Sequence, residues 1–217
     1  MTRAVYLTGG TGYVGASLLS KLLGRGHKVK ALARAGSERK LPAACEPVTG
    51  DALSAPTFVA TVPPRCTFVH MVGTPHPAPW KGRQFREVDL VALRASVMAA
   101  RAAGVEHFVY VSVAHPAPLM KSYIEVRREC ETEIERAGLI ATIVRPWYVL
   151  GPGHWWPVAL KPFYSLLEAI PSTREGARRL GLVTLDQMTE TMLRAIENPP
   201  DSTRVLTVPE IRRMPTC

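Results

Sequence analysis

Apolar residues follow two patterns along this chain, and each pattern predicts a different kind of element. Six runs of β-forming residues predict strands, at 3–7, 28–33, 47–49, 66–72, 107–113 and 139–144. Three intervening segments repeat apolar residues at every third and fourth position, which predicts helices at 13–23, 85–103 and 122–137. Most of the strands are apolar throughout, as in strands buried on both faces of a parallel sheet. The alternation therefore predicts an α/β fold with a doubly wound parallel sheet.

The character of the chain changes after Pro146, where "RPWYVLGPGHWWPVALKP" is rich in Trp, Gly and Pro and predicts a loop. Beyond it we expect helices at 163–170 and 185–197 and short strands at 180–184 and 204–208. This last third is too small for an independent domain. We therefore expect a single domain overall, with a core of residues 1–145 and a small C-terminal lobe, 146–217, packed on it.

A glycine-rich loop, "VYLTGGTGYVGASLL" at 5–19, lies between the first strand and the first helix. Its spacing is G-x-x-G-x-x-G over Gly9, Gly12 and Gly15. The first glycine permits a sharp turn, the second lets the backbone approach a pyrophosphate, and the third lets the helix pack closely on the strand. The new helix offers free N–H groups to an anion. The alternative is a glycine-rich turn with no ligand, but the strand–loop–helix context favours a dinucleotide site.

The second strand ends in "KALARAGSERK", and this ending bears on which dinucleotide binds. A site that prefers NAD places an acid here for the ribose 2′-hydroxyl, whereas this chain has Arg34, followed by Arg39 and Lys40. A guanidinium suits a 2′-phosphate, which it can hold with two parallel hydrogen bonds. We therefore predict NADP(H) over NAD(H). The alternative is that these cations form a solvated loop.

Composition excludes several classes of protein. Of 217 residues, 47% are hydrophobic and 21% charged, which argues against wholesale disorder. No apolar stretch approaches the roughly 20 residues of a membrane helix, and the first strand leaves no room for a signal peptide, so we expect a cytoplasmic protein without a membrane partner. The four cysteines lack metal-ligand spacing, so no metal site is expected. The net charge of +9 is compatible with nucleic-acid binding, but no recognition motif supports that function.

Several motifs together resemble the short-chain dehydrogenase/reductase (SDR) superfamily. They are "TGGTGYVG" (8–15), "GDALS" (50–54), "FVHMVG" (68–73), "FVYVSV" (108–113), a tyrosine-bearing helix (122–137) and "TIVRPWYVLGPG" (142–153). The chain is most similar to the extended and atypical branches with the NAD(P)-binding Rossmann fold. That atypical group includes proteins related to the accessory subunit of respiratory complex I.

The resemblance implies a set of cofactor-binding residues. It assigns the glycine loop to the pyrophosphate, Asp51 and Ala52 to the adenine, and the end of the fourth strand to the riboses. His70 in that strand also suits an ordinary core histidine. With Arg34 from the argument above, the full set is Gly9, Thr11, Gly12, Tyr13, Val14, Gly15, Arg34, Asp51, Ala52, Met71, Val72, Gly73, Arg127 and Pro146.

The resemblance also implies catalytic residues. The family uses a serine to orient the substrate oxygen, a tyrosine as acid/base, and a lysine four residues later. Ser112 and Tyr123 match the first two, but "YIEVR" places Arg127 where the lysine belongs. An arginine still supplies positive charge and can donate to ribose hydroxyls, but its proton does not leave at usable pH. Tyr123 is therefore either a live catalyst, a weakened one or a remnant.

Two functions follow from these residues. The first is an NADP(H)-dependent oxidoreductase or epimerase-like enzyme acting on a small organic molecule. Aromatic residues after Pro146 would suit an apolar or ring-shaped substrate, unless they are core: Trp147, Tyr148, Trp155 and Trp156. The second is a non-catalytic redox sensor, assembly factor or subunit, which Arg127 and the short C-terminal lobe favour. Members of the family often dimerise through two helices that include the tyrosine-bearing one, so the resemblance implies a homodimer as one arrangement.

Overall fold

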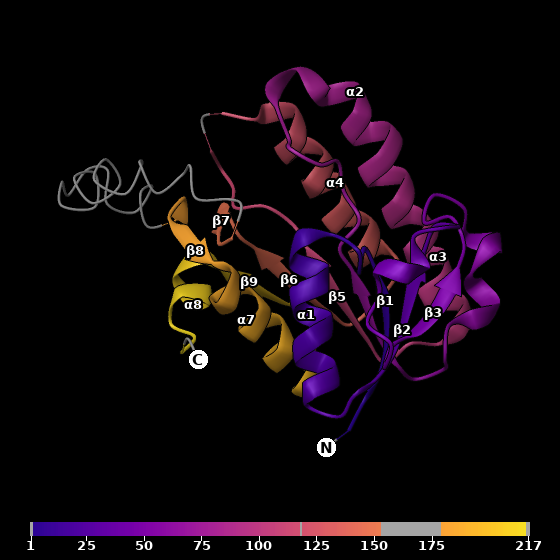
Figure 1. The fold of residues 1–217 in the computed structure, drawn as a ribbon. Helices are drawn as coiled ribbons and strands as arrows, with labels where there is room; N and C mark the ends of the chain where they lie inside the picture. Colours follow the sequence, from indigo (N-terminus) through magenta and orange to yellow (C-terminus); the bar gives the residue numbers. More distant parts are fainter. Residues whose placement is uncertain (1, 118, 153–178, 216–217) are drawn as a thin grey trace.

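The computed structural model describes residues 2–117, 119–152 and 179–215. Seven parallel strands form one sheet (Figure 1). In spatial order they are β3 (Glu46–Thr49), β2 (Lys28–Ala33), β1 (Ala4–Thr8), β4 (Thr67–His70), β5 (His107–Val111), β6 (Ala141–Arg145) and β9 (Arg204–Thr207). The chain starts in the middle of the sheet and winds outward in both directions, which is the doubly wound order. The predicted α/β fold with a parallel sheet is therefore confirmed.

Helices cover both faces of this sheet. One face carries α1 (Tyr13–Gly24), α7 (Leu185–Glu197) and α8 (Val208–Arg212). The other carries α2 (Gly82–Gln84), the π-helix η5 (Phe85–Leu90), α3 (Val91–Ala103) and α4 (Lys121–Arg136). Short 3₁₀ turns complete the described elements: η1 (Glu38–Lys40), η2 (Ala55–Thr57), η3 (Val59–Thr61) and η4 (Pro79–Lys81). A separate parallel pair is formed by β7 (Tyr148–Leu150) and β8 (Leu182–Thr184).

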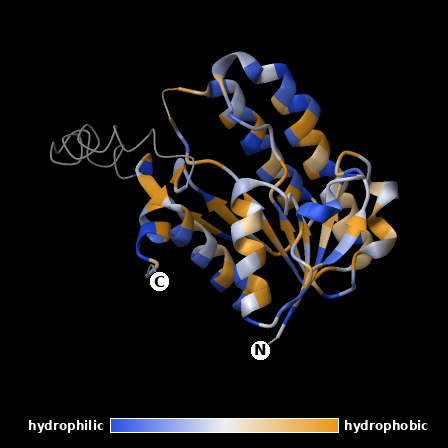
Figure 2. Cartoon of the chain, viewed as in Figure 1, coloured by the Kyte–Doolittle hydropathy of each residue, from blue (hydrophilic) through white to orange (hydrophobic). Residues whose placement is uncertain are grey.

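The apolar strands place side chains in two cores, one on each face. In β5, Phe108 and Tyr110 belong to the core under α3 and α4, whereas Val109 between them belongs to the core under α1 and α7. This follows from the two-residue period of a strand. The strands are accordingly mostly hydrophobic, while the helices alternate between hydrophilic and hydrophobic residues (Figure 2).

The helix predicted at 85–103 is one continuous helical segment with an irregular start. The segment already starts with the short α2, the π-helix η5 follows it directly, and α3 then continues as regular α-helix from Val91. Gly104 ends it in the left-handed conformation with φ 61°, as the sequence pattern suggests. π-Helical segments are often found at functional sites, and this one carries Asp89 into the interior.

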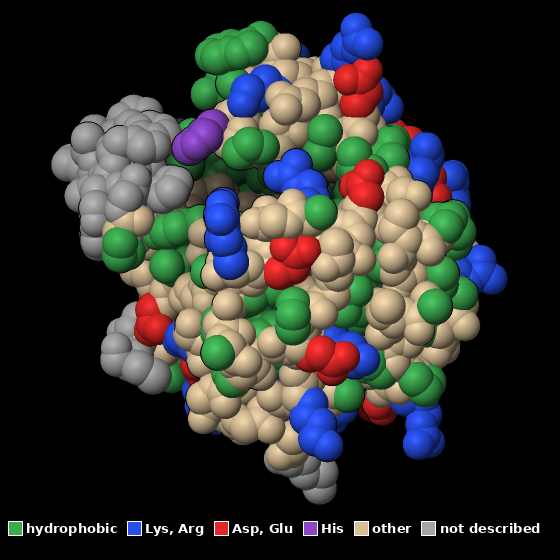
Figure 3. All heavy atoms as spheres, turned by 45° about the vertical axis from the view of Figure 1, so that its right-hand side comes forward, with side chains coloured by type: hydrophobic (Ala, Val, Ile, Leu, Met, Phe, Trp, Pro, Cys, Tyr) green, Lys and Arg blue, Asp and Glu red, His purple; other side chains and the backbone are tan. Residues whose placement is uncertain are grey.

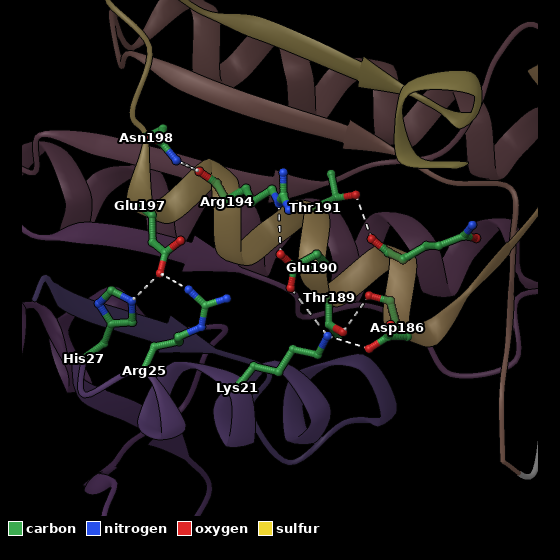
Figure 4. A network of polar contacts seen from close by, with 11 residues as sticks. Lys21, Arg25, His27, Asp186, Thr189, Glu190, Thr191, Arg194, Glu197 and Asn198 are labelled. Atoms are coloured by element: carbon green, nitrogen blue, oxygen red, sulfur yellow. Dashed lines mark hydrogen bonds and ion pairs between the residues drawn. The ribbon is translucent and has the colours of Figure 1, made fainter. Parts of the chain in front are cut away.

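The described residues of the C-terminal part join the sheet and one of its helix layers. β9 pairs with β6, and α7 packs beside α1. A capping box formed by Thr184 and Gln187 starts α7. Charged residues link the two helices (Figure 4): Lys21 contacts Asp186 at 2.5 Å and Glu190 at 3.7 Å. The division predicted at residue 145 stays a prediction, and the helix predicted at 163–170 lies outside the described residues.

Candidate functional site

The glycine loop after β1 is shaped by close backbone contacts. Gly9 has φ +84°, and a Cβ there would lie 2.7 Å from the carbonyl carbon of Met71 at the end of β4. A Cβ on Gly15 would overlap the carbonyl oxygen of Gly9. The first glycine therefore permits the turn and the third permits close packing of α1, which are the reasons that predicted a glycine at each position.

The N-terminus of α1 is open to an anion. Gly12 is its N-cap and provides no side-chain cap, and the first turn contains no acidic residue. The first helical hydrogen bond of α1 runs from the Ala16 nitrogen to the Gly12 oxygen, at 2.8 Å. The N–H groups of Tyr13, Val14 and Gly15 thus come before the helical ladder and point out of the helix end. Such an end binds phosphate groups.

A cleft of about 450 Å³ adjoins this helix end, within the size range of small-molecule sites. Figure 3 shows the molecule hollowed below its upper helices on this side. Nine residues predicted to bind the cofactor line the cleft: Gly9, Thr11, Gly12, Arg34, Asp51, Ala52, Met71, Val72 and Gly73. The sequence did not single out eight others: Leu32, Ala33, Ser37, Gly50, Leu53, Pro75, Gln84 and Val88. The carboxyl ends of β1 to β4 therefore converge on one cavity, as expected for a doubly wound sheet.

The other predicted cofactor residues do not line the cleft. The hydroxyl of Tyr13 lies against Gly151, and Val14 faces the core under α1. Pro146 is buried, and its carbonyl accepts a hydrogen bond from the Ala114 nitrogen at 2.8 Å. Their roles in binding stay predictions.

The β2 end of the cleft is positively charged. Arg34 is exposed there, and the Ser37 nitrogen donates to its carbonyl at 2.8 Å, which folds Ser37 back to the same cleft. Arg39 and Lys40 do not line it. Glu38 accepts a 2.7 Å hydrogen bond from Thr49, and that bond lowers the pKa of Glu38. Of the three cations that the sequence offered, Arg34 alone borders the cleft in the described part of the chain.

Arg127 is held in a buried network beneath the loop that follows β4. Its Nη2 donates to Asp89 at 2.7 Å, and its Nη1 donates to the Tyr110 hydroxyl at 3.1 Å and to the Val111 carbonyl at 3.0 Å. Gly73 lies directly above, since a Cβ there would overlap Nη2. Arg127 is only 6% exposed and does not line the cleft, whereas Gly73, which lies against its guanidinium, does.

Tyr123 is half-buried beside this network. Its ring packs on Phe85 with centroids 4.9 Å apart, and the guanidinium carbon of Arg127 lies 5.0 Å from its centroid. Burial raises the pKa of the Tyr123 hydroxyl, whereas the positive charge of Arg127 opposes that shift. The net direction is upward, so the phenol is protonated at neutral pH. The structure thus brings Tyr123 and Arg127 together, through the face of the ring.

Ser112 is buried and engaged elsewhere. Its Oγ donates to Glu131 on α4 at 2.5 Å, and that carboxylate also accepts from Nε of Arg145 at 3.0 Å and from its Nη2. Among the described contacts, none joins Ser112 to Tyr123 or Arg127. The role predicted for Ser112, orienting a substrate oxygen, stays a prediction, and this geometry gives it no direct support.

His70 is a core histidine. Its Nδ1 hydrogen-bonds with Thr8 at 3.1 Å and with Ser96 at 2.9 Å, and the side chain is fully buried. Burial lowers its pKa to about 3, and the charge of Arg127 acts in the same direction, so the ring is neutral. The reading of this residue as core rather than as part of the ribose site therefore fits its surroundings.

The aromatic residues after β6 are only partly described. Trp147 and Tyr148 contact each other edge to face, with centroids 5.6 Å apart. Trp147 packs against the core under α1 and α7, as one of the two interpretations of this segment expects. Trp155 and Trp156 lie outside the described residues. Within the described ranges, no helix is long and apolar enough to cross a membrane.

Comparisons with known proteins agree with this geometry. The chain matches the NAD(P)H-binding family over residues 9–152 and belongs to that family. This confirms the predicted resemblance to NAD(P)-binding SDR proteins. It is 30% identical to a ceramide reductase of Caulobacter vibrioides over 177 residues, covering 80% of this chain and 55% of that protein. It is 34% identical over 115 residues to a 3 beta-hydroxysteroid dehydrogenase/Delta 5→4-isomerase of Mycobacterium tuberculosis, covering 50% of this chain and 31% of that one.

The chain thus spans about half the length of the first relative and about a third of the second. Solved structures show the same fold. The enzyme WbmH of Bordetella bronchiseptica in complex with NAD+ superposes with a TM-score of 0.69 and 20% identity, over 95% of this chain and 76% of that one. The UDP-glucose 4-epimerase of Thermus thermophilus, in complex with NAD, has a TM-score of 0.67 and 16% identity over 96% and 81%.

Proposed function

We propose that this chain is an NADP(H)-dependent oxidoreductase that reduces a carbonyl group of a small apolar molecule. The observation that carries the proposal is the cleft itself: an open helix end and a glycine turn at its base, a cation at one end, and a protonated phenol packed near the other. The loop Met71–Gly73 connects the two ends, since it lines the cleft and lies directly above Arg127.

The cofactor preference is argued from Arg34 and Ser37. A 2′-phosphate needs positive charge and hydrogen-bond donors, and a guanidinium with a neighbouring hydroxyl supplies both. Among the described lining residues the one acid is Asp51, which follows β3 rather than β2. The lining residues that follow β2 in the chain therefore include no carboxylate, and that is the position at which an NAD site carries its acid.

The chemistry of reduction suits a protonated tyrosine. A bound nicotinamide would supply the hydride to the carbonyl carbon. Tyr123 would donate its proton to the carbonyl oxygen, and the positive charge of Arg127 beside the ring would stabilise the phenolate that remains. Arg127 keeps its own proton, so the proton that Tyr123 gives up is returned from solvent. An epimerase would use the same residues: Tyr123 would take up the hydroxyl proton while the oxidised nicotinamide takes the hydride from the carbinol carbon, and both would then be returned with the hydride on the opposite face of that carbon.

The proposed substrate class rests on two relatives. Their names describe a ceramide reductase and a 3 beta-hydroxysteroid dehydrogenase, and both ceramides and steroids are apolar molecules that carry oxygen functions. The cleft end nearest α2 and η5 is lined by Pro75, Gln84 and Val88, of which two are apolar.

A second function, non-catalytic NADP(H) binding by a sensor or subunit, is favoured by one specific observation. The side chains of Arg127 and Ser112 are committed to partners inside the protein: Asp89, Tyr110 and the Val111 carbonyl for Arg127, and Glu131 for Ser112. Because the hydrogen-bond donors of these two residues already bond to acceptors within the protein, fewer donors are left to hold a substrate oxygen.

One experiment separates the two functions. Binding of NADPH and NADH is measured by calorimetric titration, and NADPH oxidation is followed with long-chain and steroid ketones. Turnover that disappears in Tyr123→Phe but persists in Tyr6→Phe, which removes a hydroxyl bonded to Thr61 in the core, supports the oxidoreductase. Tight NADPH binding without turnover of any ketone supports the sensor. Tighter binding of NADH than of NADPH contradicts the cofactor preference.

A further inference from the structure

Two loops at the mouth of the cleft share a sequence. After β4 the chain reads His-Pro-Ala-Pro-Trp-Lys (76–81), and after β5 it reads His-Pro-Ala-Pro-Leu-Met-Lys (115–121). Both segments therefore follow neighbouring strands with a proline-rich stretch, then a large apolar residue, then a lysine. We call residues 75–83 and 114–122 the paired tips; residue 118 is not among the described positions.

The paired tips carry the two most exposed large apolar side chains of the described residues. Trp80 is 83% exposed and Leu119 is 67% exposed. The two tips also lie against each other, since a Cβ on Gly82 would stand 3.3 Å from that of Ser122. Hydrophobic side chains accordingly gather at the top of the molecule, with Lys and Arg side chains nearby (Figure 3).

The charge of the paired tips has one sign. Their 18 residues include Lys81, Arg83 and Lys121 and contain no Asp or Glu. Arg83 is neutralised by Glu87 at 2.6 Å, but Lys81 donates to the neutral Pro75 carbonyl at 2.8 Å and keeps its full charge. Lys121 is exposed at the start of α4. Exposed apolar residues that lie between lysines without a carboxylate partner suit a partner with an apolar interior and an anionic outer layer.

We propose that the paired tips dock this protein on an anionic lipid bilayer. Trp80 and Leu119 would enter the interfacial region, where tryptophan is favoured, while Lys81 and Lys121 contact the anionic headgroups. This would be peripheral attachment, without a membrane-spanning helix, and it departs from the expectation that no membrane is involved.

The position of the paired tips also explains what such docking would achieve. Pro75 in the first tip lines the cleft, and the second tip leads directly into Tyr123. An apolar substrate leaving the bilayer beside the tips would reach the candidate catalytic tyrosine without crossing water. This step rests on the function proposed above, whereas the docking itself does not.

Vesicle sedimentation tests the docking. Full-length protein is mixed with vesicles of phosphatidylcholine alone or with added phosphatidylglycerol, and the bound fraction is measured at low and high salt. We expect binding to the anionic vesicles that weakens with salt. Lys121→Gln should weaken it about fivefold, since a lysine near an anionic surface contributes about 1 kcal/mol. Trp80→Ser should weaken it about tenfold or more, through lost apolar burial.

Matched controls lie at the opposite edge of the sheet. Lys28 is an exposed lysine at the start of β2, and Ile140 is a 40% exposed apolar residue just before β6. Lys28→Gln and Ile140→Ser should leave binding unchanged. The proposal is overturned if wild-type protein binds neither vesicle, or if the controls lose as much as the tip variants. It is also overturned if Trp80→Ser instead abolishes self-association in the absence of vesicles, because the tips are then a protein interface.

A turnover measurement separates this inference from the proposed function. A ketone substrate is presented either in detergent micelles or within the vesicles. The tip variants should keep their turnover of the micellar ketone and lose turnover of the vesicle-borne ketone. Equal turnover of both by Trp80→Ser contradicts the delivery role. If no ketone is turned over in either form, the proposed function fails, and the sedimentation result still decides the docking.

Discussion

Asp89 joins Arg127 to the loop that follows β4 and lines the cleft. One carboxylate oxygen accepts from Arg127 at 2.7 Å, and the other accepts from the nitrogen and hydroxyl of Thr74, at 2.9 and 2.6 Å. Both charged side chains are almost fully buried. The pair therefore fixes the end of β4 relative to α4, from beneath the cavity.

Replacing Asp89 by Asn should destabilise the protein strongly. It leaves the buried guanidinium of Arg127 without its counter-charge, and loss of one partner of a buried pair costs about 3–5 kcal/mol. Urea unfolding measures the effect. The control is Glu87→Gln, which removes the exposed partner of Arg83 and should cost less than about 1 kcal/mol. Similar losses in the two variants would mean that the buried pair contributes no more than a surface one.

Gly15→Ala should abolish NADPH binding, because its new Cβ would overlap the Gly9 carbonyl and push α1 away from the loop. Gly24→Ala in the last position of the same helix is the control, since nothing lies within 4 Å of its new Cβ. That control should gain about 0.5–1 kcal/mol of stability, the helical preference of alanine over glycine. Calorimetric titration with NADPH distinguishes the two. Wild-type affinity in Gly15→Ala would show that the loop does not cradle the cofactor.

Arg34→Ser should weaken NADPH binding about tenfold to a hundredfold, the loss of one charge-assisted contact with a phosphate. NADH binding should hardly change, since NADH lacks that phosphate. Arg39→Ser serves as the control, because Arg39 follows in the same loop but does not line the cleft. If Arg34→Ser weakens NADPH and NADH equally, the residue supports the loop rather than the 2′-phosphate.

Stability should fall as the pH drops below neutral, because two histidines are buried neutral. Burial lowers the pKa of His70 to about 3 and that of His107 to about 4. The unfolded state therefore takes up protons first, so the stabilisation is present above about pH 6.5 and is lost progressively toward pH 4. Each ring contributes a slope of up to about 1.4 kcal/mol per pH unit.

Urea unfolding at successive pH values gives this slope, and proton NMR of the ring C–H signals gives the titration of each histidine. His107→Gln, which retains a partner for Thr142, should remove about half of the slope due to these two rings. Ring signals of His70 and His107 that titrate near pH 6 in the folded protein would contradict the expected burial effect.

The parallel α/β architecture and the glycine loop could be predicted from the sequence because each depends on local pattern. The strands are short apolar runs, and Gly9 and Gly15 stand where a Cβ would overlap backbone. The ends of several elements differ by a few residues, as for the strand predicted at 66–72 and observed at Thr67–His70. Its last predicted residues turn away to line the cleft instead of pairing.

Long-range polar contacts could not be predicted in this way. Asp89 lies in a segment whose apolar residues have ordinary helical spacing. That spacing does not predict the π-helix η5, in which Asp89 is buried. Ser112 occupies the expected place at the end of β5, but its partner Glu131 is 19 residues away on α4. The family motif therefore predicted where Ser112 lies in the fold. It could not predict the partner of its hydroxyl, because that partner depends on how α4 packs against β5.

The packing of α7 on α1 also determines when the core around α1 can be completed during synthesis. Leu18, Leu19 and Leu22 of α1 share their core with Met188 and Met192, which leave the ribosome about 170 residues later. A nascent chain that ends near residue 152, where the match to the family stops, would cover these leucines from the sheet side but lack the α7 side of this core. The helix that follows the glycine loop therefore reaches its final environment only after Met192 has emerged.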